Sequence, residues 1–263
     1  MYLLDHNMNS LGENLALDEA LLEWIDTDFN TCEILRFWES SQYGVVLGAS
    51  RKYRDDLRID ACQRNTIPVV RRSSGGGTVL VGPGCLNIAL LLQYDRHPAL
   101  TTIGDAHQYV LQRVMAALQP ILPEKTLHCQ GIADLCLDDR KVGGTAQRRC
   151  RNSLLYHMSL LCHFPIPEIA HYLKEPVDQP DYRQGRSHTD FLINLEIDLE
   201  TLHARPDPLV DLQEHQDPAT GASILVLRDL GPGLDGDVQV TPRTVVVPEH
   251  RDRLGHLFGG VEA

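Results

Sequence analysis

A glycine-rich stretch flanked by cations is the part of this sequence best suited to chemistry. It reads Arg71-Arg72-Ser73-Ser74-Gly75-Gly76-Gly77-Thr78. Glycines carry no β-carbon, so successive backbone N–H groups can turn toward one centre and approach a phosphate or carboxylate closely. Arginine adds bidentate, charge-assisted hydrogen bonds to the same anions. Three glycines alone suit a surface hairpin equally well, but the neighbouring arginines and hydroxyls favour an anion site.

A second cluster lies further along the chain, where a lysine is followed by glycines. The stretch reads Asp138-Asp139-Arg140-Lys141-Val142-Gly143-Gly144-Thr145-Ala146-Gln147. Glycines beside a lysine leave its ammonium unshielded and let a ligand approach the strand backbone. Such a lysine neutralises phosphate and polarises a carbonyl while negative charge develops on the oxygen. Taken alone, the cations are as readily explained as solvated residues that close an acidic turn.

The composition restricts the class of protein. The chain has 263 residues and a net charge of -12, which argues against a nucleic-acid partner because such proteins usually carry a basic surface. Five cations within twelve residues nevertheless predict one electropositive pocket for a small anion. They are Arg140, Lys141, Arg148, Arg149 and Arg151.

Targeting and cysteine patterns predict a cytoplasmic protein. The N-terminus lacks a secretory signal, and no apolar run is long enough to cross a membrane, so no membrane association is expected. Seven scattered cysteines without a C-x-x-C pair indicate reduced thiols and no structural zinc. The twelve histidines show no metal-binding spacing, so no metal-ligating residue is predicted.

Strands and helices in mixed order must position the two clusters. Asn14 to Ile25 has the apolar spacing of a helix with Asn14 as its cap and Asp18 in its first turns, and Ile103 to Leu118 predicts a second helix. Several strand pairs joined by short turns predict an α+β fold with a mixed, largely antiparallel sheet flanked by helices. The predicted strands are 33–38, 43–47, 67–71, 78–81, 88–92, 132–137, 140–146 and 154–162.

Both clusters together describe an anion cradle and a lysine, as an acyl-adenylate would require. With Gly84 to Asn87, Asp134-Leu135 and Leu155 to Leu161, they make the chain resemble the lipoate-protein ligase family, which is related to biotin ligases and octanoyltransferases. The resemblance implies a biotin/lipoate ligase-like catalytic domain over residues 1–200. Residues 201–263 do not resemble the family's usual accessory domain and are expected to form a C-terminal extension packed on the core.

The resemblance implies a two-step acyl transfer. Lipoate or octanoate would attack the α-phosphate of ATP in the presence of Mg²⁺. A lysine of a lipoyl carrier domain, in a 2-oxoacid dehydrogenase or the glycine cleavage H protein, would then attack the acyl-AMP. Lys141 would be catalytic, contacting carbonyl and phosphate oxygens in both steps. The substrate and adenylate would be held by Arg71, Arg72, Ser73, Ser74, Gly75, Gly76, Gly77, Asn87, Gly143, Gly144, Thr145 and Ala146.

Alternatives remain open at this point. An octanoyltransferase would need no ATP and would form a cysteine thioester, for which Cys129 is the candidate nucleophile. Cys150 follows Arg148 and Arg149, whose charges predict a lowered thiol pKa. A non-catalytic protein that binds lipoate or a nucleotide is a third reading. The family's catalytic units without an accessory domain often need a separate subunit, so an accessory partner is also implied.

Two polar features are left without a firm role. His157 lies in a predicted strand, where it either faces a ligand or is a satisfied structural histidine. The loop that carries Tyr182, Arg183, Arg186 and His188 would contact the nucleotide or the carrier domain, or else pair with nearby aspartates. Those aspartates are Asp178, Asp181 and Asp190.

Overall fold

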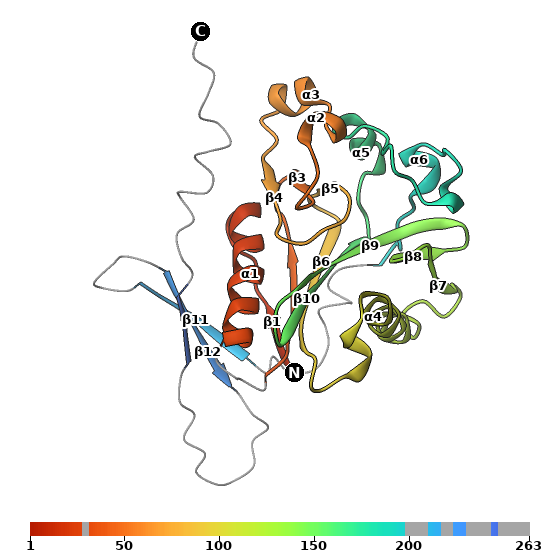
Figure 1. The fold of residues 1–263 in the computed structure, drawn as a ribbon. Coiled ribbons are helices and arrows are strands. Elements are labelled where there is room, and N and C mark those ends of the chain that lie inside the picture. Colours follow the sequence, from red (N-terminus) through yellow and green to blue (C-terminus); the bar gives the residue numbers. More distant parts are fainter. Residues whose placement is uncertain (28–31, 198–209, 217–222, 230–242, 247–263) are drawn as a thin grey trace.

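A large, mostly antiparallel sheet forms the centre of the fold in a computed structural model (Figure 1). The structure describes residues 1–27, 32–197, 210–216, 223–229 and 243–246. The strands of this sheet are β1 (Tyr2–Asp5), β2 (Ile34–Glu39), β6 (Cys85–Gln93), β7 (Leu127–Gln130), β8 (Asp134–Leu137), β9 (Arg140–Arg149) and β10 (Ser153–Leu161). Their order is β1-β2-β6-β10-β9-β8-β7, and β1 with β2 is the one parallel pair in it. The predicted α+β class is confirmed.

One long helix covers each face of the sheet. Helix α1 (Leu11–Thr27) buries Leu17 and Leu21 against Ala89 and Leu155 of the sheet. Helix α4 (Ile103–Leu118) covers the other face, packing residues such as Val110 and Leu111 against strands β8 to β10. Figure 1 shows the two helices on opposite sides of the strands. Apolar residues at helical spacing therefore enclose the sheet from both sides.

The helix starts are set by side-chain caps. The Thr102 hydroxyl accepts a hydrogen bond from the Asp105 N–H at 3.1 Å, so α4 begins where its sequence predicts. Helix α1 begins earlier than predicted, because Ser10 and Glu13 form a reciprocal capping box with hydrogen bonds of 2.9 and 3.2 Å. The prediction of Asn14 as the cap was wrong, since Asn14 lies inside the helix.

A smaller sheet carries the glycine-rich stretch. Its strands are β3 (Gly44–Leu47), β4 (Val69–Arg71) and β5 (Val79–Val81), with β3 in the middle. Strand β3 pairs in parallel with β4 and antiparallel with β5, while β2 before it pairs with β6 in the large sheet. The short turn between β2 and β3 therefore carries the chain from one sheet to the other. Short helices complete this end of the molecule: α2 (Tyr53–Asp56), α3 (Ile59–Arg64), α5 (Ile166–Tyr172) and α6 (His188–Phe191).

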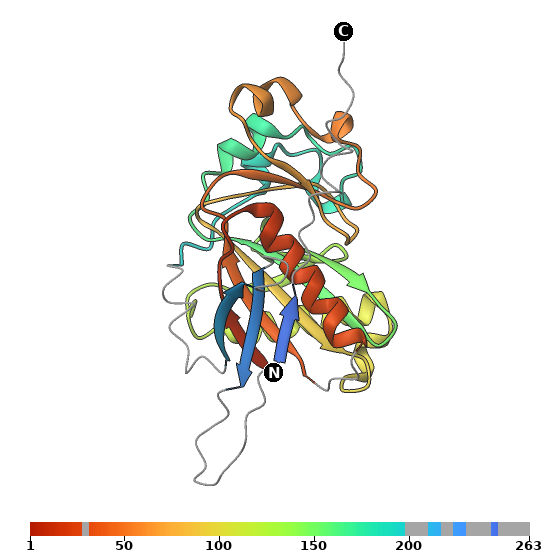
Figure 2. The same ribbon diagram turned by 90° about the vertical axis from the view of Figure 1, so that its left-hand side faces the viewer.

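The C-terminal part contributes a third sheet. Strands β11 (Val210–Gln216), β12 (Ser223–Asp229) and β13 (Arg243–Val246) pair antiparallel beside α1 (Figure 2). Much of the stretch 201–263 lies outside the described residues, so its role as a packed extension and the domain division at residue 200 stay predictions. No described helix combines the length and apolar character needed to cross a bilayer.

Candidate active site

A cavity of about 720 Å³ receives residues from both predicted clusters. Its walls come from the large sheet, from the small sheet β4-β3-β5, from the glycine loop (residues 72–78) and from the segment 174–188 between α5 and α6. The volume lies in the range of pockets that bind small molecules and cofactors. The apolar part of the lining includes Leu15, Trp38, Val79, Ile88, Met158 and Leu161. The lining therefore has apolar side chains for an apolar chain and polar groups for a polar head group.

The glycine loop presents open backbone to this cavity. Gly76 adopts a φ of +90°, which favours glycine, and both Gly76 and Gly77 line the cavity. A β-carbon built on Gly75 or Gly77 would meet no atom within 4 Å. On the opposite side the loop is tightly packed, since a β-carbon on Gly48 would lie 2.1 Å from the Gly76 carbonyl oxygen. The loop is thus fixed from behind and accessible from the front.

Arg72 stabilises the glycine loop through hydrogen bonds within it. The Arg72 Nε donates to the Ser74 hydroxyl at 2.9 Å, and its Nη2 donates to the carbonyls of Gly75 and Gly77 at 2.6 and 2.9 Å. Burial lowers the pKa of Arg72 to about 10. Although Arg72 lines the cavity, its guanidinium already has three partners within the loop. Its structural contribution is to shape the loop.

Arg71 and the two serines support the loop without lining the cavity. The Arg71 Nη1 donates to the carbonyls of Gly48 and Arg51 at 2.8 and 2.7 Å. Ser74 is buried and accepts the bond from Arg72, and Ser73 is half-buried. Neither serine nor Arg71 nor Gly75 is among the residues that line the cavity. The predicted cluster therefore divides into a lining part and a supporting part.

A β-bulge brings Lys141 to the cavity. The β8–β9 register passes from Leu135 opposite Gly143 to Cys136 opposite Lys141, which leaves Val142 as an extra residue. Because side chains alternate along a strand, one extra residue reverses the side to which the following residues point. Lys141 therefore shares the face of Asp134 and Gly144, and all three line the cavity.

The Lys141 ammonium, which the neighbouring glycines leave unshielded, is held in an ion pair. Its Nζ lies 2.7 Å from Oδ1 of Asp134, and the other carboxylate oxygen of Asp134 accepts a hydrogen bond of 2.7 Å from the Tyr182 hydroxyl. Both side chains of the ion pair are partly exposed to the cavity, at 26% for Lys141 and 18% for Asp134. Sequence analysis used Asp134 only as part of the family resemblance and placed Tyr182 in a loop of open role, so it predicted no contact of either residue with Lys141. The signal was present in Asp134, which opens the strand that pairs with the lysine strand.

The remaining predicted residues of β9 lie on alternate faces. Gly144 and Ala146 pair with Ser159 and His157 on the cavity face. Gly143 faces the other side, where a β-carbon would lie 2.7 Å from Leu160. All four residues from 143 to 146 contribute to the lining.

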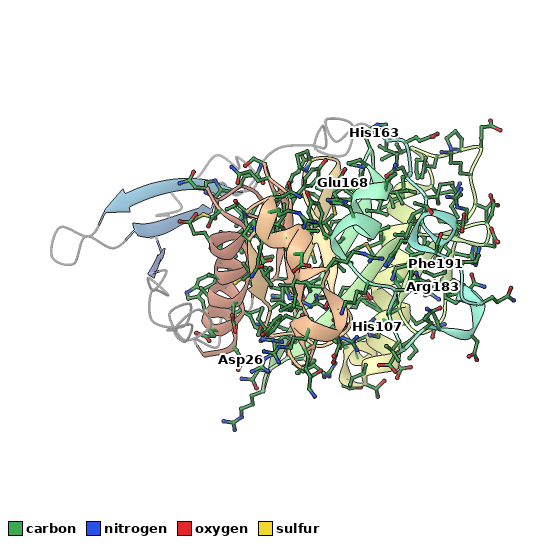
Figure 3. The ribbon with its side chains drawn as sticks, turned by 90° about the horizontal axis from the view of Figure 1, so that it is seen from above. Asp26, His107, His163, Glu168, Arg183 and Phe191 are labelled. Carbon is green, nitrogen blue, oxygen red and sulfur yellow. The ribbon has the colours of Figure 1, made fainter. Side chains whose placement is uncertain are left out.

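Thr145 lines the cavity, but its hydroxyl points toward α4. It bonds to the Tyr156 hydroxyl at 3.0 Å, to His107 at 3.2 Å and to the Ala133 carbonyl at 2.9 Å. His107 is labelled in Figure 3. The hydroxyl therefore ties the turn before Asp134 to the helix on the far face.

Asn87 and His157 form the polar floor of the cavity. The Asn87 amide oxygen accepts a hydrogen bond of 2.9 Å from Ser159, and the register places Asn87, Ser159 and Gly144 in one row across three strands. The Nε2 of His157 is buried and has no hydrogen-bond partner among the described residues. Burial, together with the charge of Arg72, lowers the pKa of His157 to about 3. This imidazole is therefore neutral at physiological pH.

A neutral His157 predicts a specific loss of stability in acid. The unfolded imidazole has a pKa of 6.5 and the folded one a pKa of about 3, so between these values only the unfolded state takes up the proton. The free energy of unfolding should fall, as the pH falls through that window, by up to about 1.4 kcal/mol per pH unit. Denaturant unfolding of His157→Gln from pH 7 to pH 4 should show a shallower slope than the wild type. His171→Gln, at an exposed position, serves as the control. Parallel curves for wild type and His157→Gln would contradict the prediction.

The cations around Lys141 do not converge on one pocket. The Arg140 Nη2 donates to the carbonyls of Leu192 and Thr189, and the Arg149 Nη2 to those of Leu100 and Thr101. Among the five cations from 140 to 151, Lys141 is the one in the lining. The predicted electropositive pocket was wrong, because Arg140 and Arg149 lie at opposite ends of β9 and donate to backbone carbonyls of different segments.

Two arginine ion pairs stabilise the segment 174–188. Arg183 pairs with Glu175, and its guanidinium lies 4.8 Å from the centre of the Phe191 ring. Both Arg183 and Phe191 are labelled in Figure 3. Arg186 pairs with Asp139 at 2.8 Å. These partners differ from the predicted Asp178, Asp181 and Asp190. Arg183 and His188 also line the cavity, so the segment is part of the site.

The cysteines are poorly placed for nucleophilic attack. Cys129 pairs with Leu135, on the face opposite Asp134, and its thiol lies 4.0 Å from Met115 of α4. Burial raises the pKa of Cys129. Burial and Asp26 also raise the pKa of Cys150, so its predicted lowering by the adjacent arginines was wrong. Cys85 lines the cavity, but burial holds its thiol pKa well above the ordinary range.

Known proteins place the chain in one family. Residues 10–204 match the model of the lipoyl protein ligase A/B catalytic domain. Similar curated proteins include human mitochondrial lipoyl amidotransferase LIPT1 (27% identity, 64% of this chain and 42% of that protein), octanoyltransferase LipM of an Exiguobacterium species (29%, 60% and 64%) and lipoate-protein ligase LplJ of Bacillus subtilis (26%, 74% and 56%). This chain thus spans less than two thirds of the length of these relatives.

Solved structures of similar fold are also lipoate-protein ligases. One is a bi-partite lipoate protein ligase from Thermoplasma acidophilum, reported with its E2 lipoyl domain; it has a TM-score of 0.63 and 19% identity over 77% of this chain and 78% of that one. Another is a lipoate-protein ligase A bound with ATP, with a TM-score of 0.63 and 20% identity over 77% and 80% of the two chains. They share the biotin/lipoate ligase fold with this chain. With a match over most of its length, the chain belongs to the lipoyl protein ligase A/B catalytic domain family, whose members are ligases and lipoyl or octanoyl transferases.

Proposed function

We propose that this protein is a lipoate-protein ligase that forms an acyl-AMP and transfers its lipoyl or octanoyl group to a lysine of a carrier domain. The observation that carries the proposal is the geometry around Lys141. Its ammonium stands in a cavity with open glycine backbone, while the candidate thiol of Cys129 lies on the other face of the sheet. An adenylate route needs the lysine and the cradle, whereas a thioester route also needs a reactive thiol.

The cavity suits the two parts of the acyl-adenylate. The apolar walls that include Trp38, Ile88 and Met158 would receive the acyl chain. The backbone of Gly76 and Gly77 would receive phosphate oxygens, since both glycines line the cavity and have no β-carbon to block a close approach. A neutral His157 at the floor adds a hydrogen-bonding group without adding charge.

Lys141 would serve both steps. In the first, the acyl carboxylate oxygen bonds to the α-phosphorus of ATP and pyrophosphate leaves. In the second, the neutral amine of the acceptor lysine attacks the acyl carbonyl, AMP leaves, and the amine loses a proton to solvent. Negative charge develops on oxygen in each step, and the Lys141 ammonium would stabilise it.

The donor set also accommodates Mg²⁺ together with ATP. Magnesium is usually held by one or two carboxylates plus phosphate oxygens. Asp178 lines the cavity, is 86% exposed and has one ion pair, with Arg51 at 3.3 Å, so it would be available as such a carboxylate. When bound, the ion would neutralise phosphate charge. The described residues offer no group of three metal-ligating side chains, which fits an ion held mainly by the nucleotide.

We propose a lipoyl carrier domain, of a 2-oxoacid dehydrogenase or the glycine cleavage H protein, as the acceptor. The Thermoplasma relative was studied with its E2 lipoyl domain, which supports this choice. That relative is also described as bi-partite, and this supports a separate accessory subunit for the present chain. The reaction would take place in the cytoplasm. A purely binding role is not retained, because the related proteins are enzymes.

An octanoyltransferase remains the second candidate because LipM, at 29% identity, has that activity by name. One assay separates the two. The purified protein is incubated with an apo lipoyl domain and either octanoate with Mg-ATP or octanoyl-acyl carrier protein, and the mass of the domain is measured.

The ligase proposal predicts a mass increase that requires ATP and is unchanged in Cys129→Ser. Retention is expected because Cys129 lies on the face of the sheet opposite the one that carries Lys141. Modification from the acyl carrier protein without ATP, abolished by Cys129→Ser, would establish the transferase instead. Since an accessory subunit is part of the proposal, chemically prepared octanoyl-AMP is supplied in a parallel reaction to test transfer alone.

A further inference from the structure

We propose that Tyr182 is a positioning residue that acts through Asp134 to aim the Lys141 ammonium. This inference rests on the proposed function, in which Lys141 contacts the reacting oxygens. Tyr182 lies in the short helical turn Asp181–Arg183, within the polar segment whose role the sequence left open. The proposal gives that segment a part in catalysis besides lining the cavity.

Three side chains from separate parts of the chain form a linear relay. The Tyr182 hydroxyl donates to Oδ2 of Asp134 at 2.7 Å, and Oδ1 of Asp134 lies 2.7 Å from Nζ of Lys141. Each carboxylate oxygen therefore has its own partner, and the carboxylate cannot rotate without losing one of them. A charge-assisted bond at each end is stronger than a neutral one. The phenol thus fixes the plane from which Asp134 holds the lysine.

Two glycines leave the space that this arrangement needs. A β-carbon on Gly144 would lie 2.9 Å from Nζ and 3.0 Å from Cε of Lys141, so the lysine passes directly over that glycine. A β-carbon on Gly131, whose φ is +62°, would lie 3.3 Å from Cε1 of Tyr182. The Tyr182 ring also packs on Phe191, with ring centres 5.2 Å apart. Packing therefore holds the ring in place independently of its hydroxyl.

The chemistry of the phenol suits a permanent donor. Burial, with the hydrogen bond to Asp134, raises the pKa of Tyr182 well above its ordinary value. The hydroxyl therefore keeps its proton over the working pH range. The Cys136 thiol lies 3.6 Å from the same oxygen and donates to it. The phenol oxygen consequently has a donor of its own and directs its single proton to Asp134.

The relay has a functional consequence for the ligand. An anion that enters the cavity competes with Asp134 for the Lys141 ammonium. If Asp134 is held by Tyr182, the ammonium can turn toward the ligand while its partner stays in position, and it does so from a defined starting point. Without the hydroxyl, the ion pair is free to rearrange. Loss of Tyr182 should therefore affect the chemical step more than ligand binding.

The test is the variant Tyr182→Phe, which keeps the ring and removes the hydroxyl. We expect the rate of transfer from octanoyl-AMP to an apo lipoyl domain to fall about tenfold, with little change in the KM for octanoyl-AMP. Tyr109→Phe is the matched control, because it loses a hydroxyl bond of similar length, 2.8 Å to His97, on a helix outside the cavity. A Tyr182→Phe rate within twofold of the wild type overturns the proposal.

A double-mutant cycle separates positioning from general destabilisation. If Tyr182 acts through Asp134, Tyr182→Phe should have little further effect in an Asp134→Asn background. Fully additive losses overturn the proposal, even when each single loss is large.

The mobility of the Lys141 side chain can be measured without catalysis, so this measurement tests the role of Tyr182 separately from the proposed function. The chain contains four lysines, so ¹³C-labelled lysine side chains give a simple NMR spectrum in which Lys141→Ala assigns Lys141. Tyr182→Phe should increase the mobility of the Lys141 ε-methylene and leave Lys125 unchanged. An unchanged Lys141 signal overturns the relay. An inactive wild type with the expected NMR change would refute the proposed function alone.

Discussion

Lys141→Ala is expected to lose acyl transfer by about a thousandfold, since the lysine stabilises developing negative charge in both steps. The loss should appear with octanoate and ATP and also with preformed octanoyl-AMP, because each step uses the same ammonium. Mass analysis of the carrier domain measures the first reaction, and a stopped time course measures the second. Lys141→Arg should recover little activity, because a planar guanidinium does not fit the narrow space above Gly144.

A matched lysine variant controls for charge and folding. Lys125 also pairs with a carboxylate, that of Glu196 at 3.4 Å, but it lies outside the cavity. Lys125→Ala should therefore keep full activity and a similar thermal midpoint. Activity of Lys141→Ala within tenfold of the wild type would refute the assignment of this cavity as the active site.

Asp18→Ala is expected to destabilise the fold by about 3–5 kcal/mol. The Asp18 carboxylate and the Arg36 guanidinium are both fully buried, with Oδ1 and Nη1 2.6 Å apart. The Trp38 indole N–H also donates to Asp18 at 3.2 Å. Removing the carboxylate leaves a buried guanidinium without its counter-charge, hydrogen-bonded to Asn14 and to the His6 carbonyl. Urea unfolding monitored by tryptophan fluorescence measures the effect.

The matched controls for Asp18 use an exposed pair and a double variant. Glu196→Ala breaks the pair with Lys125 at a position that is 73% exposed, and it should cost less than about 1 kcal/mol. Replacing both buried partners, Asp18→Leu with Arg36→Met, should recover most of the lost stability because no unpaired charge remains. Equal losses for Asp18→Ala and the double variant would show that packing rather than charge determines the effect.

Features set by local sequence were the ones that sequence reasoning could predict. Helix α4 has the predicted bounds, Ile103–Leu118, since Thr102 caps it and its apolar spacing is regular. The glycine loop lies at the cavity because glycine is needed both at Gly76, with its positive φ, and where the backbone must be open. The bounds of the helix and the need for glycine in the loop both follow from neighbouring residues. Both could therefore be inferred without knowing the fold.

Features that depend on partners elsewhere in the chain were missed. Arg71 and Arg72 have the right chemistry for an anion, but Arg71 donates to the distant carbonyl of Arg51 and Arg72 donates to the loop carbonyl of Gly75. Asp18 was assigned to the first turns of its helix, yet it lies in the interior and pairs with Arg36. The alternation of Ile34, Arg36 and Trp38 along β2 did contain a signal, because it places a charge on a buried face.

The extra residue at Val142 has a consequence for comparing this chain with its relatives. A deletion of one residue next to the lysine would change the site. Without Val142, the Lys141 ammonium would point toward α4 and away from the cavity. Changes in length at the hairpin tip, between Leu137 and Arg140, leave the pairing beyond the tip untouched. The spacing from the lysine to its first glycine therefore determines on which side of the sheet the ammonium lies.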